Sequence, residues 1–180
     1  MSDPAAVAKA WLTPAGRAPW AIRWLGQMVD WSVIAIGGGM AALVFFNVSL
    51  HLVSKDLAWV TELGELLLVW VTFLGGACAA QRGMHMSINE FVDKLTPQHR
   101  RWADAAILAL SLAMLAVLTW YGWSLVQGNW SNQLTVLEWP MAIQYMGMAV
   151  GCSLAAVFVL FDLWQTVRGV PRELRYPSTH

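Results

Sequence analysis

The polar side chains that could do chemistry in this chain gather around one apolar stretch, within residues 61–95. Glu62 and Glu65 stand at the start of an uncharged run, and Arg82 and His85 follow its end. A carboxylate inside a membrane-spanning helix can couple transport to an ion, or it can pair with a neighbouring protein. A basic residue at the C-terminal end of a helix complements the helix dipole. These residue types therefore indicate transport or assembly.

Motifs of the common enzyme classes are absent from the sequence. The four histidines lie at the ends of apolar runs or outside them, so they cannot supply two facing haem ligands within a bilayer. There is no HExxH, no CxxC, no phosphate-binding glycine loop and no serine in a nucleophile elbow. Cys78 and Cys152 lie inside apolar runs, as packing residues do. We expect no catalysis, no cofactor and no metal site.

The composition is that of an integral membrane protein. Of the 180 residues, 58% are hydrophobic and 12% are charged, whereas about a quarter of the residues of a soluble domain are charged. The formal net charge of +0 gives no basic face for nucleic acid. We therefore expect membrane lipids, and no nucleic acid, around the chain.

Four apolar runs are long enough to cross a bilayer. They cover about 31–50, 59–81, 102–126 and 140–166. Between the second and third runs, Ser87 and Glu90 have the spacing of a capping box, and hydrophobic residues recur at helical intervals up to Leu95. Thr96 and Pro97 then predict the start of the third helix. The expected fold class is an all-α membrane protein with four transmembrane helices and a short amphipathic helix between spans two and three.

The charges predict the organisation of the chain across the membrane. Ten of the eleven Lys and Arg residues lie before span one, between spans two and three, or after span four, and Lys55 lies on the other side. By the positive-inside rule, both termini are cytoplasmic. We expect a tail and interfacial lead-in at 1–30, a four-helix membrane domain at 31–168 and a second tail at 169–180.

Small and aromatic residues inside the spans indicate where helices pack. The triplet Gly37–Gly39 would let another backbone approach closely. Trp70 and Trp120 lie deeper than the tryptophans that mark the span ends, so we expect both to pack against protein. In the second span, helical spacing puts mostly polar or small residues along one stripe: Glu62, Glu65, Val69, Thr72 and Gly76.

Six carboxylates lie within about two helical turns of a predicted span boundary. They are Asp30, Glu62, Glu65, Asp104, Glu138 and Asp162. Four of them are interpreted as solvated or helix-end groups. For Glu62 and Glu65, contact with a partner protein and a simple boundary position both stay open, since Glu65 lies about 9 Å inside a helix that begins at Trp59.

The second span and the residues after it resemble the small, Q-type membrane subunit of TRAP transporters. The pattern is an acidic residue at the start of the span, then Trp70, Phe73-Leu74-Gly75-Gly76, Ala79-Ala80, Arg82, His85, Met86, Ile88, Phe91 and Leu95. Where that family often has an acidic residue soon after the His, this chain has Asn89, followed by Glu90. The size, the four spans and the cytoplasmic termini are similar over the whole chain.

The resemblance implies a tripartite, sodium-driven importer of organic acids in a bacterial inner membrane. A large, M-type membrane subunit would carry the substrate and sodium sites and move them in elevator fashion. A periplasmic, P-type receptor would deliver the substrate, and the small subunit would be a static scaffold. The residues expected to contact the partner or to support the structure are Glu62, Glu65, Trp70, Gly75, Gly76, Arg82, His85 and Asn89.

Other classes and roles stay open from the residues alone. An autonomous small exporter would use Glu65 as its coupling site, and a membrane anchor of a redox complex would need haem-ligating histidines within the spans. Arg82 and His85 could anchor the helix end to lipid headgroups, or they could fix the surface helix against the large subunit. We favour the second role, in which Arg82→Lys would lower uptake because lysine lacks the planar fork of arginine.

Overall fold

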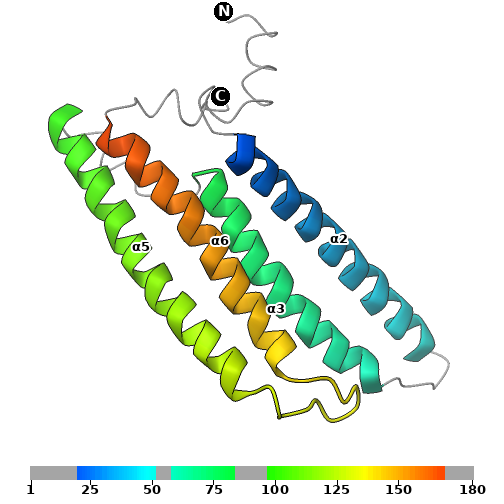
Figure 1. The fold of residues 1–180 in the computed structure, drawn as a ribbon. Helices are drawn as coiled ribbons and strands as arrows, with labels where there is room; N and C mark the ends of the chain where they lie inside the picture. The colour runs from blue at the N-terminus through cyan, green and yellow to red at the C-terminus, as the bar shows by residue number, and fades with distance from the viewer. Residues whose placement is uncertain (1–19, 52–57, 84–96, 169–180) are drawn as a thin grey trace, which may run out of the picture.

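The computed structural model describes residues 20–51, 58–83 and 97–168 (Figure 1). Four helices make up most of them: α2 (Trp20–His51), α3 (Ala58–Gln81), α5 (Pro97–Gly128) and α6 (Ala142–Val167). These residues contain no strand, and a single isolated bridge joins Gln133 to Pro140. Each helix is long and apolar enough to cross a membrane. The predicted all-α membrane fold with four spans is therefore confirmed, while the predicted amphipathic helix lies outside the described residues.

The observed helices extend the predicted spans at their ends. Helix α5 begins at Pro97, as predicted. Helix α2 begins at Trp20, and the predicted interfacial lead-in continues into the span as one helix of 32 residues. At 1.5 Å per residue this helix is about 48 Å long, whereas the hydrocarbon core of a bilayer is about 30 Å thick. Helix α2 must therefore tilt or extend into the headgroup region.

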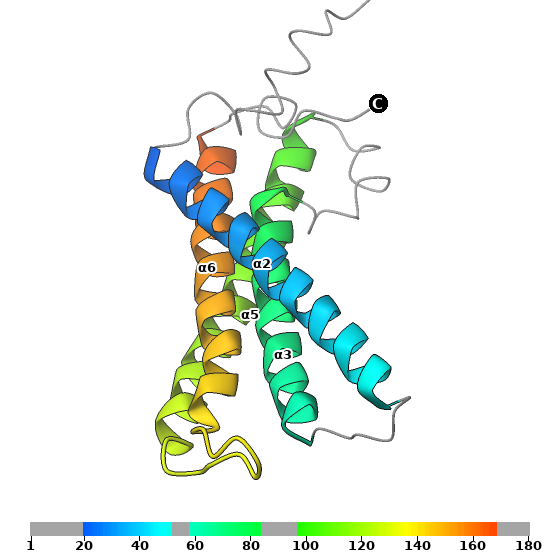
Figure 2. The ribbon, with the colours of Figure 1, turned by 90° about the vertical axis from the view of Figure 1, so that its right-hand side faces the viewer.

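Helix α6 lies at the centre of the arrangement. It packs against α3 on one side and α5 on the other, and α2 packs against α3. Figure 1 shows the resulting order α5, α6, α3, α2, and Figure 2 shows α2 crossing α3 obliquely. The most hydrophobic window of α6 is 44% buried, against none of that of α2. Helix α2 is therefore the most peripheral of the four.

The helices alternate in direction, so the start of one helix lies at the same end of the molecule as the end of the next. We call the end with the start of α2 and the end of α3 the Arg82 end, and the opposite end the Glu62 end. The larger buried cluster lies toward the Arg82 end and consists mainly of small and medium side chains: Val29, Ala77, Ala80, Leu108, Ala155, Phe158 and Val159. The loop at 129–141 joins α5 to α6 at the Glu62 end.

Glycines of α6 and α5 lie at close contacts between helices. A Cβ atom added at Gly151 would lie 2.5 Å from Phe73 Cβ, and one added at Gly147 would lie 3.1 Å from Trp70 Cγ. A Cβ atom at Gly122 would lie 3.1 Å from Ala149 Cα. Side chains therefore cannot be added at these positions without moving a neighbouring helix. The Gly147 and Gly151 pair, four residues apart, is what brings α6 onto α3.

The predicted close packing of the Gly37–Gly39 triplet is only partly observed. A Cβ atom at Gly37 would lie 3.6 Å from the Val71 side chain, but at Gly38 and Gly39 no described atom lies within 4 Å. Successive residues of a helix point about 100° apart, so three consecutive glycines cannot all face one neighbour. For Gly38 and Gly39, close approach of another backbone is not observed among the described residues and stays a prediction.

Two further expectations differ from the structure. Asp104 and Asp162 lie near helix ends as predicted, but they are buried, with 4% and 5% of their surface exposed, rather than solvated. Trp120 is 77% exposed and does not pack against protein within the described chain. Its ring borders a surface hollow between α5 and α6, the main neighbour of α5.

Candidate functional site

Helix α3 and the turn that follows it carry six of the eight residues expected to contact a partner or support the structure: Glu62, Glu65, Trp70, Gly75, Gly76 and Arg82. His85 and Asn89 lie outside the described residues. The structure divides the six into two sets. Three of them bond to other parts of the same chain, and the other three lie where the chain offers no partner among its described residues.

Trp70 fastens the middle of α3 to the start of α6. Its ring nitrogen Nε1 donates a hydrogen bond of 3.0 Å to the backbone oxygen of Ile143. The ring lies over Gly147, whose missing side chain makes room for it. The expectation that Trp70 packs against protein is confirmed, and the protein is its own chain. A buried indole usually needs such a partner for its N–H group.

Glu62 fastens the start of α3 to the loop between α5 and α6. Both of its carboxylate oxygens lie 3.0 Å from the backbone nitrogen of Val136, and Oε2 lies 2.9 Å from that of Leu137. Hydrogen bonds from backbone N–H groups to a carboxylate are charge-assisted and therefore stronger than neutral ones. The carboxylate thus satisfies two donors of the loop, a role that sequence reasoning missed.

The loop that Glu62 holds has a defined backbone. Leu134 N donates to Trp139 O at 2.8 Å, and Met141 N donates to Asn132 O at 2.8 Å. Between them the chain reverses, and Glu138 takes a left-handed backbone conformation with φ 54°. Because the two strand-like arms pair with each other, the N–H groups at the reversal are left for Glu62 to accept.

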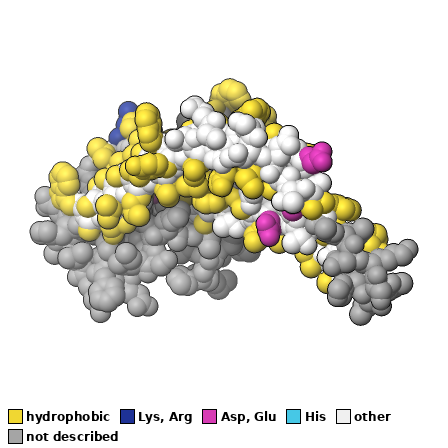
Figure 3. All heavy atoms as spheres, turned by 90° about the horizontal axis from the view of Figure 1, so that it is seen from below, with side chains coloured by type: hydrophobic (Ala, Val, Ile, Leu, Met, Phe, Trp, Pro, Cys, Tyr) yellow, Lys and Arg dark blue, Asp and Glu magenta, His cyan; other side chains and the backbone are white. Residues whose placement is uncertain are grey.

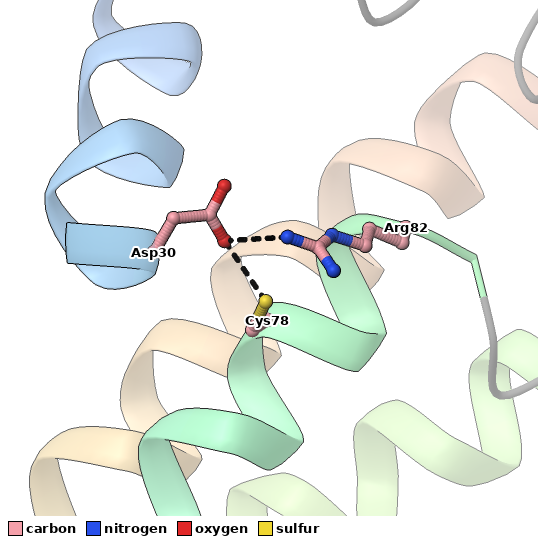
Figure 4. Close-up of polar contacts among 3 residues, drawn as sticks. All are labelled: Asp30, Cys78 and Arg82. Carbon is pink, nitrogen blue, oxygen red and sulfur yellow. Dashed lines mark hydrogen bonds and ion pairs between the residues drawn. The ribbon is translucent and has the colours of Figure 1, made fainter. Parts of the chain in front are cut away.

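Arg82 lies at the other end of α3 and pairs with α2 (Figure 4). Its Nη2 atom lies 3.2 Å from Asp30 Oδ1, and the Cys78 thiol donates to the same oxygen at 2.9 Å. The pair is partly open, with 58% of the Arg82 side chain and 31% of the Asp30 side chain exposed. One nitrogen and one oxygen make this contact, so it does not use the full fork of the guanidinium group.

Glu65, Gly75 and Gly76 make up the second set. Glu65 is exposed and forms no hydrogen bond or ion pair with the described residues. A Cβ atom added at Gly75 or Gly76 would find no described atom within 4 Å. Residues that share this side of α3 at helical spacing are called the open face of α3 below: Glu65, Leu68, Thr72, Gly76 and Ala79. The Thr72 hydroxyl is satisfied within the helix by Leu68 O, at 2.7 Å.

Comparison with known proteins identifies the family. Residues 40–169 match the family described as tripartite ATP-independent periplasmic transporters, DctQ component. The chain is 25% identical over 142 residues to a TRAP transporter small permease protein of Haemophilus influenzae, covering 76% of this chain and 83% of that protein. This chain belongs to the TRAP small permease family. It is also 26% identical over 134 residues to the C4-dicarboxylate TRAP transporter small permease protein of Rhodobacter capsulatus, covering 72% of this chain and 59% of that protein.

The family match confirms the resemblance drawn from the second span and places the chain as the small permease subunit of a tripartite transporter in a membrane. The match begins at Met40, in the second half of α2, and includes all of α3, α5 and α6. Both partners of the Trp70 and Glu62 contacts therefore lie inside it. The Arg82 contact joins a matched residue to Asp30, which lies before the match.

Two surface hollows of the small permease lie among its described residues, and neither is enclosed. One, of about 620 Å³, lies where α2 faces Val71 of α3 and is lined by apolar side chains. The other, of about 660 Å³, lies between α5 and α6 and includes Thr119, Trp123 and Ser153. Neither hollow is lined by a charged residue, and the described residues contain no group of His, Cys, Asp or Glu suited to a metal ion. The acidic groups seen from the Glu62 end are separate patches among hydrophobic side chains (Figure 3).

Proposed function

We propose that this small permease is the static scaffold of a sodium-driven organic acid importer in a bacterial inner membrane. In this proposal, it braces a large, M-type membrane subunit that binds substrate and sodium, while a periplasmic, P-type receptor delivers the acid. The observation that carries the scaffold role is the set of contacts along α3. Glu62, Trp70 and Arg82 tie the two ends and the middle of this helix to the loop, to α6 and to α2.

The distribution of charge favours a scaffold role for this subunit over a role in carrying ions. A subunit that carries ions itself needs polar groups near the middle of the membrane. In α2, α3 and α6 the central turns consist mostly of Ala, Leu, Val, Gly and Met. The carboxylates Asp30, Glu62 and Asp162 lie toward the helix ends. We therefore assign the transport sites to the large subunit.

The orientation that goes with this role has both termini in the cytoplasm. The first described helix begins and the last one ends at the same end of the molecule, so the two termini leave on one side. Ten of the eleven basic residues lie on the side that we assign to the cytoplasm. A reporter that is active only after export, fused after His180, should stay silent.

Reconstitution tests the function directly. Vesicles would contain the large subunit with or without the small permease, receive the receptor and a sodium gradient, and be assayed with C4-dicarboxylates and other organic acids. We expect uptake that requires the small permease and the gradient. Full uptake without the small permease would contradict the scaffold role. Transport by the small permease alone, lost in Glu65→Gln, would instead establish an autonomous exporter.

A further inference from the structure

The position of Glu65 sets it apart from Glu62, the other carboxylate of α3. It lies one turn beyond Glu62 along α3, about 9 Å past Trp59. Glu62 accepts bonds from two backbone N–H groups, whereas Glu65 is exposed and has no partner among the described residues. A carboxylate that faces hydrocarbon is costly, so such groups face protein and pair with donors or cations. A neighbouring protein in the membrane would meet this need, since the described residues supply no partner for Glu65.

The rest of the open face of α3 suits close contact with another helix. Gly76 lies eleven residues after Glu65, which is about three helical turns, so both lie on the same side. The open space around Gly75 and Gly76 lets a neighbouring backbone approach α3 closely. Because the Thr72 hydroxyl is already bonded within the helix, it can lie in such a contact without a further partner.

We propose that the open face of α3 docks a transmembrane helix of the large subunit, and that this helix places a Lys or Arg side chain against Glu65. The inference rests on the proposed function, because it takes the large subunit as the partner. The negative charge of Glu65 decides which partner suits the open face of α3. Lipid tails offer no donor to Glu65, and a second copy related by a two-fold axis along the membrane normal would bring its own Glu65 to the same depth. The like charges would then repel.

Helix α2 shows why the α3 face is chosen. Gly38 and Gly39 also have open space around them. However, α2 carries no charged residue between Trp31 and Leu50, so this face can lie against lipid without burying a charge. The two helices thus offer a matched comparison in which both have open glycines and one has a carboxylate.

Copurification of the large subunit with a tagged small permease in mild detergent tests the proposal. We expect Gly76→Leu and Glu65→Lys to lower the recovered large subunit by about tenfold or more, because a side chain then blocks the approach or a like charge faces the partner. Glu65→Gln should lower it by a smaller factor. Gly39→Leu is the matched glycine control, and Glu138→Lys makes the same charge change on an exposed loop residue. Both controls should copurify as the wild type does.

A second measurement does not depend on the stability of these variants. A photo-crosslinking amino acid at Leu68, which is 49% exposed on the open face, should form an adduct with the large subunit. The same group at Met114 of α5, which is 62% exposed, should label lipid only. A charge reversal of one Lys or Arg in the large subunit should restore recovery with Glu65→Lys.

The outcomes separate this inference from the proposed function. If the wild-type chain recovered no large subunit, the proposed function itself would fail. If the wild type recovered it while Gly76→Leu did so equally and Leu68 labelled lipid or a second copy of the chain, the surface would be wrong and the scaffold role would stand. Wild-type recovery with Glu65→Lys and Glu65→Gln would overturn the charge pairing.

Discussion

Glycines lie at the side of α3 that faces α6 and on its open face, but the two surfaces differ in which helix supplies them. On the α6 side, the glycines belong to the partner helix, and α3 supplies the large rings of Trp70 and Phe73 that fill the space over Gly147 and Gly151. On the open face, α3 itself has the glycine, Gly76, and no described atom fills the space beside it. A glycine in a spanning helix therefore marks a contact only when a neighbour faces it.

The two carboxylates of α3 also differ in whether a neighbouring part of the chain lies beside them. Glu62 and Glu65 are one turn apart in the same helix, and both begin the same apolar span. Glu62 is held by the backbone of the loop that passes beside it, and Glu65 is exposed, with no partner among the described residues. The difference comes from where the loop lies, and the spacing of the two residues carries no information about that.

The largest expected effect comes from adding one methyl group at a glycine of each surface, Gly151 at the α3–α6 contact and Gly76 on the open face. Gly151→Ala would place a Cβ atom 2.5 Å from Phe73 Cβ and 2.8 Å from Phe73 O, so backbone must move. We expect the free energy of unfolding to fall by about 2 kcal/mol. Gly76→Ala meets no atom and gains helix propensity, so stability should rise by up to about 1 kcal/mol. Circular dichroism can monitor the unfolding of both variants in detergent and show whether each variant is less or more stable than the wild type.

The comparison would break if the two alanine variants changed stability in the same direction. A loss in Gly76→Ala without the large subunit present would mean that the open face is filled within the chain. If Gly151→Ala left the stability unchanged, α6 could move away from Phe73 at little cost. The close approach at Gly147 would then no longer be evidence of a tight α3–α6 contact.

The sequence predicts the spans well because their signal is local. Apolar length alone marks four helices, and a proline after a capping residue marks the start of α5 at Pro97. The order of the helices is another matter. Trp70 and Ile143 are 73 residues apart, and Glu62 and Val136 are 74 apart, and no pattern in one sequence pairs such distant positions. The central place of α6 therefore had to come from the structure.

The candidate site was predicted as a list of residues but not as two sets. The sequence singled out α3 because charged residues stand at both ends of its apolar run. It could not show that Trp70 and Arg82 find partners inside the chain, since Ile143 and Asp30 lie on other helices. The Gly147 and Gly151 pair was missed, although its four-residue spacing in an apolar helix was a usable signal.

The second prediction concerns the acid that is held by the loop. Glu62→Gln keeps the shape and one acceptor oxygen but loses the charge, so the bonds to Val136 and Leu137 should weaken by about 1 kcal/mol. Hydrogen exchange at these two amides should become severalfold faster. Glu65→Gln is the matched control and should leave both rates unchanged. If the two amides exchanged as slowly in Glu62→Gln as in the wild type, the loop would hold its shape without the carboxylate.

The third prediction compares two tryptophans. Trp70→Phe keeps an aromatic ring over Gly147 and removes the N–H group that bonds to Ile143 O, so we expect a loss of about 1 kcal/mol in unfolding free energy. Trp120→Phe changes a ring that is 77% exposed and should be neutral within error in the chain alone. Thermal unfolding in the same detergent compares them. A larger loss from Trp120→Phe would mean that its ring packs against protein after all.

The smallest expected effect is at the Arg82 end, where α2 meets α3. An exposed ion pair contributes about 0–1 kcal/mol, and the open, single contact between Arg82 and Asp30 belongs at that level. A double-mutant cycle of Arg82→Ala and Asp30→Ala should therefore give a coupling energy below about 1 kcal/mol. Lysine can make a single contact of this kind, so Arg82→Lys should not change the stability of the chain alone.

That expectation sharpens the proposed role of Arg82 toward the large subunit. Since Arg82→Lys keeps the charge and the contact to Asp30, a loss of uptake in the reconstituted complex cannot come from the α2–α3 contact. It would have to come from a contact that needs the planar fork, which the single bond to Asp30 leaves partly unused. If the Arg82→Lys variant showed wild-type uptake and wild-type stability, the role of Arg82 would be limited to its contact with α2. The contacts with the large subunit would then be confined to the open face of α3.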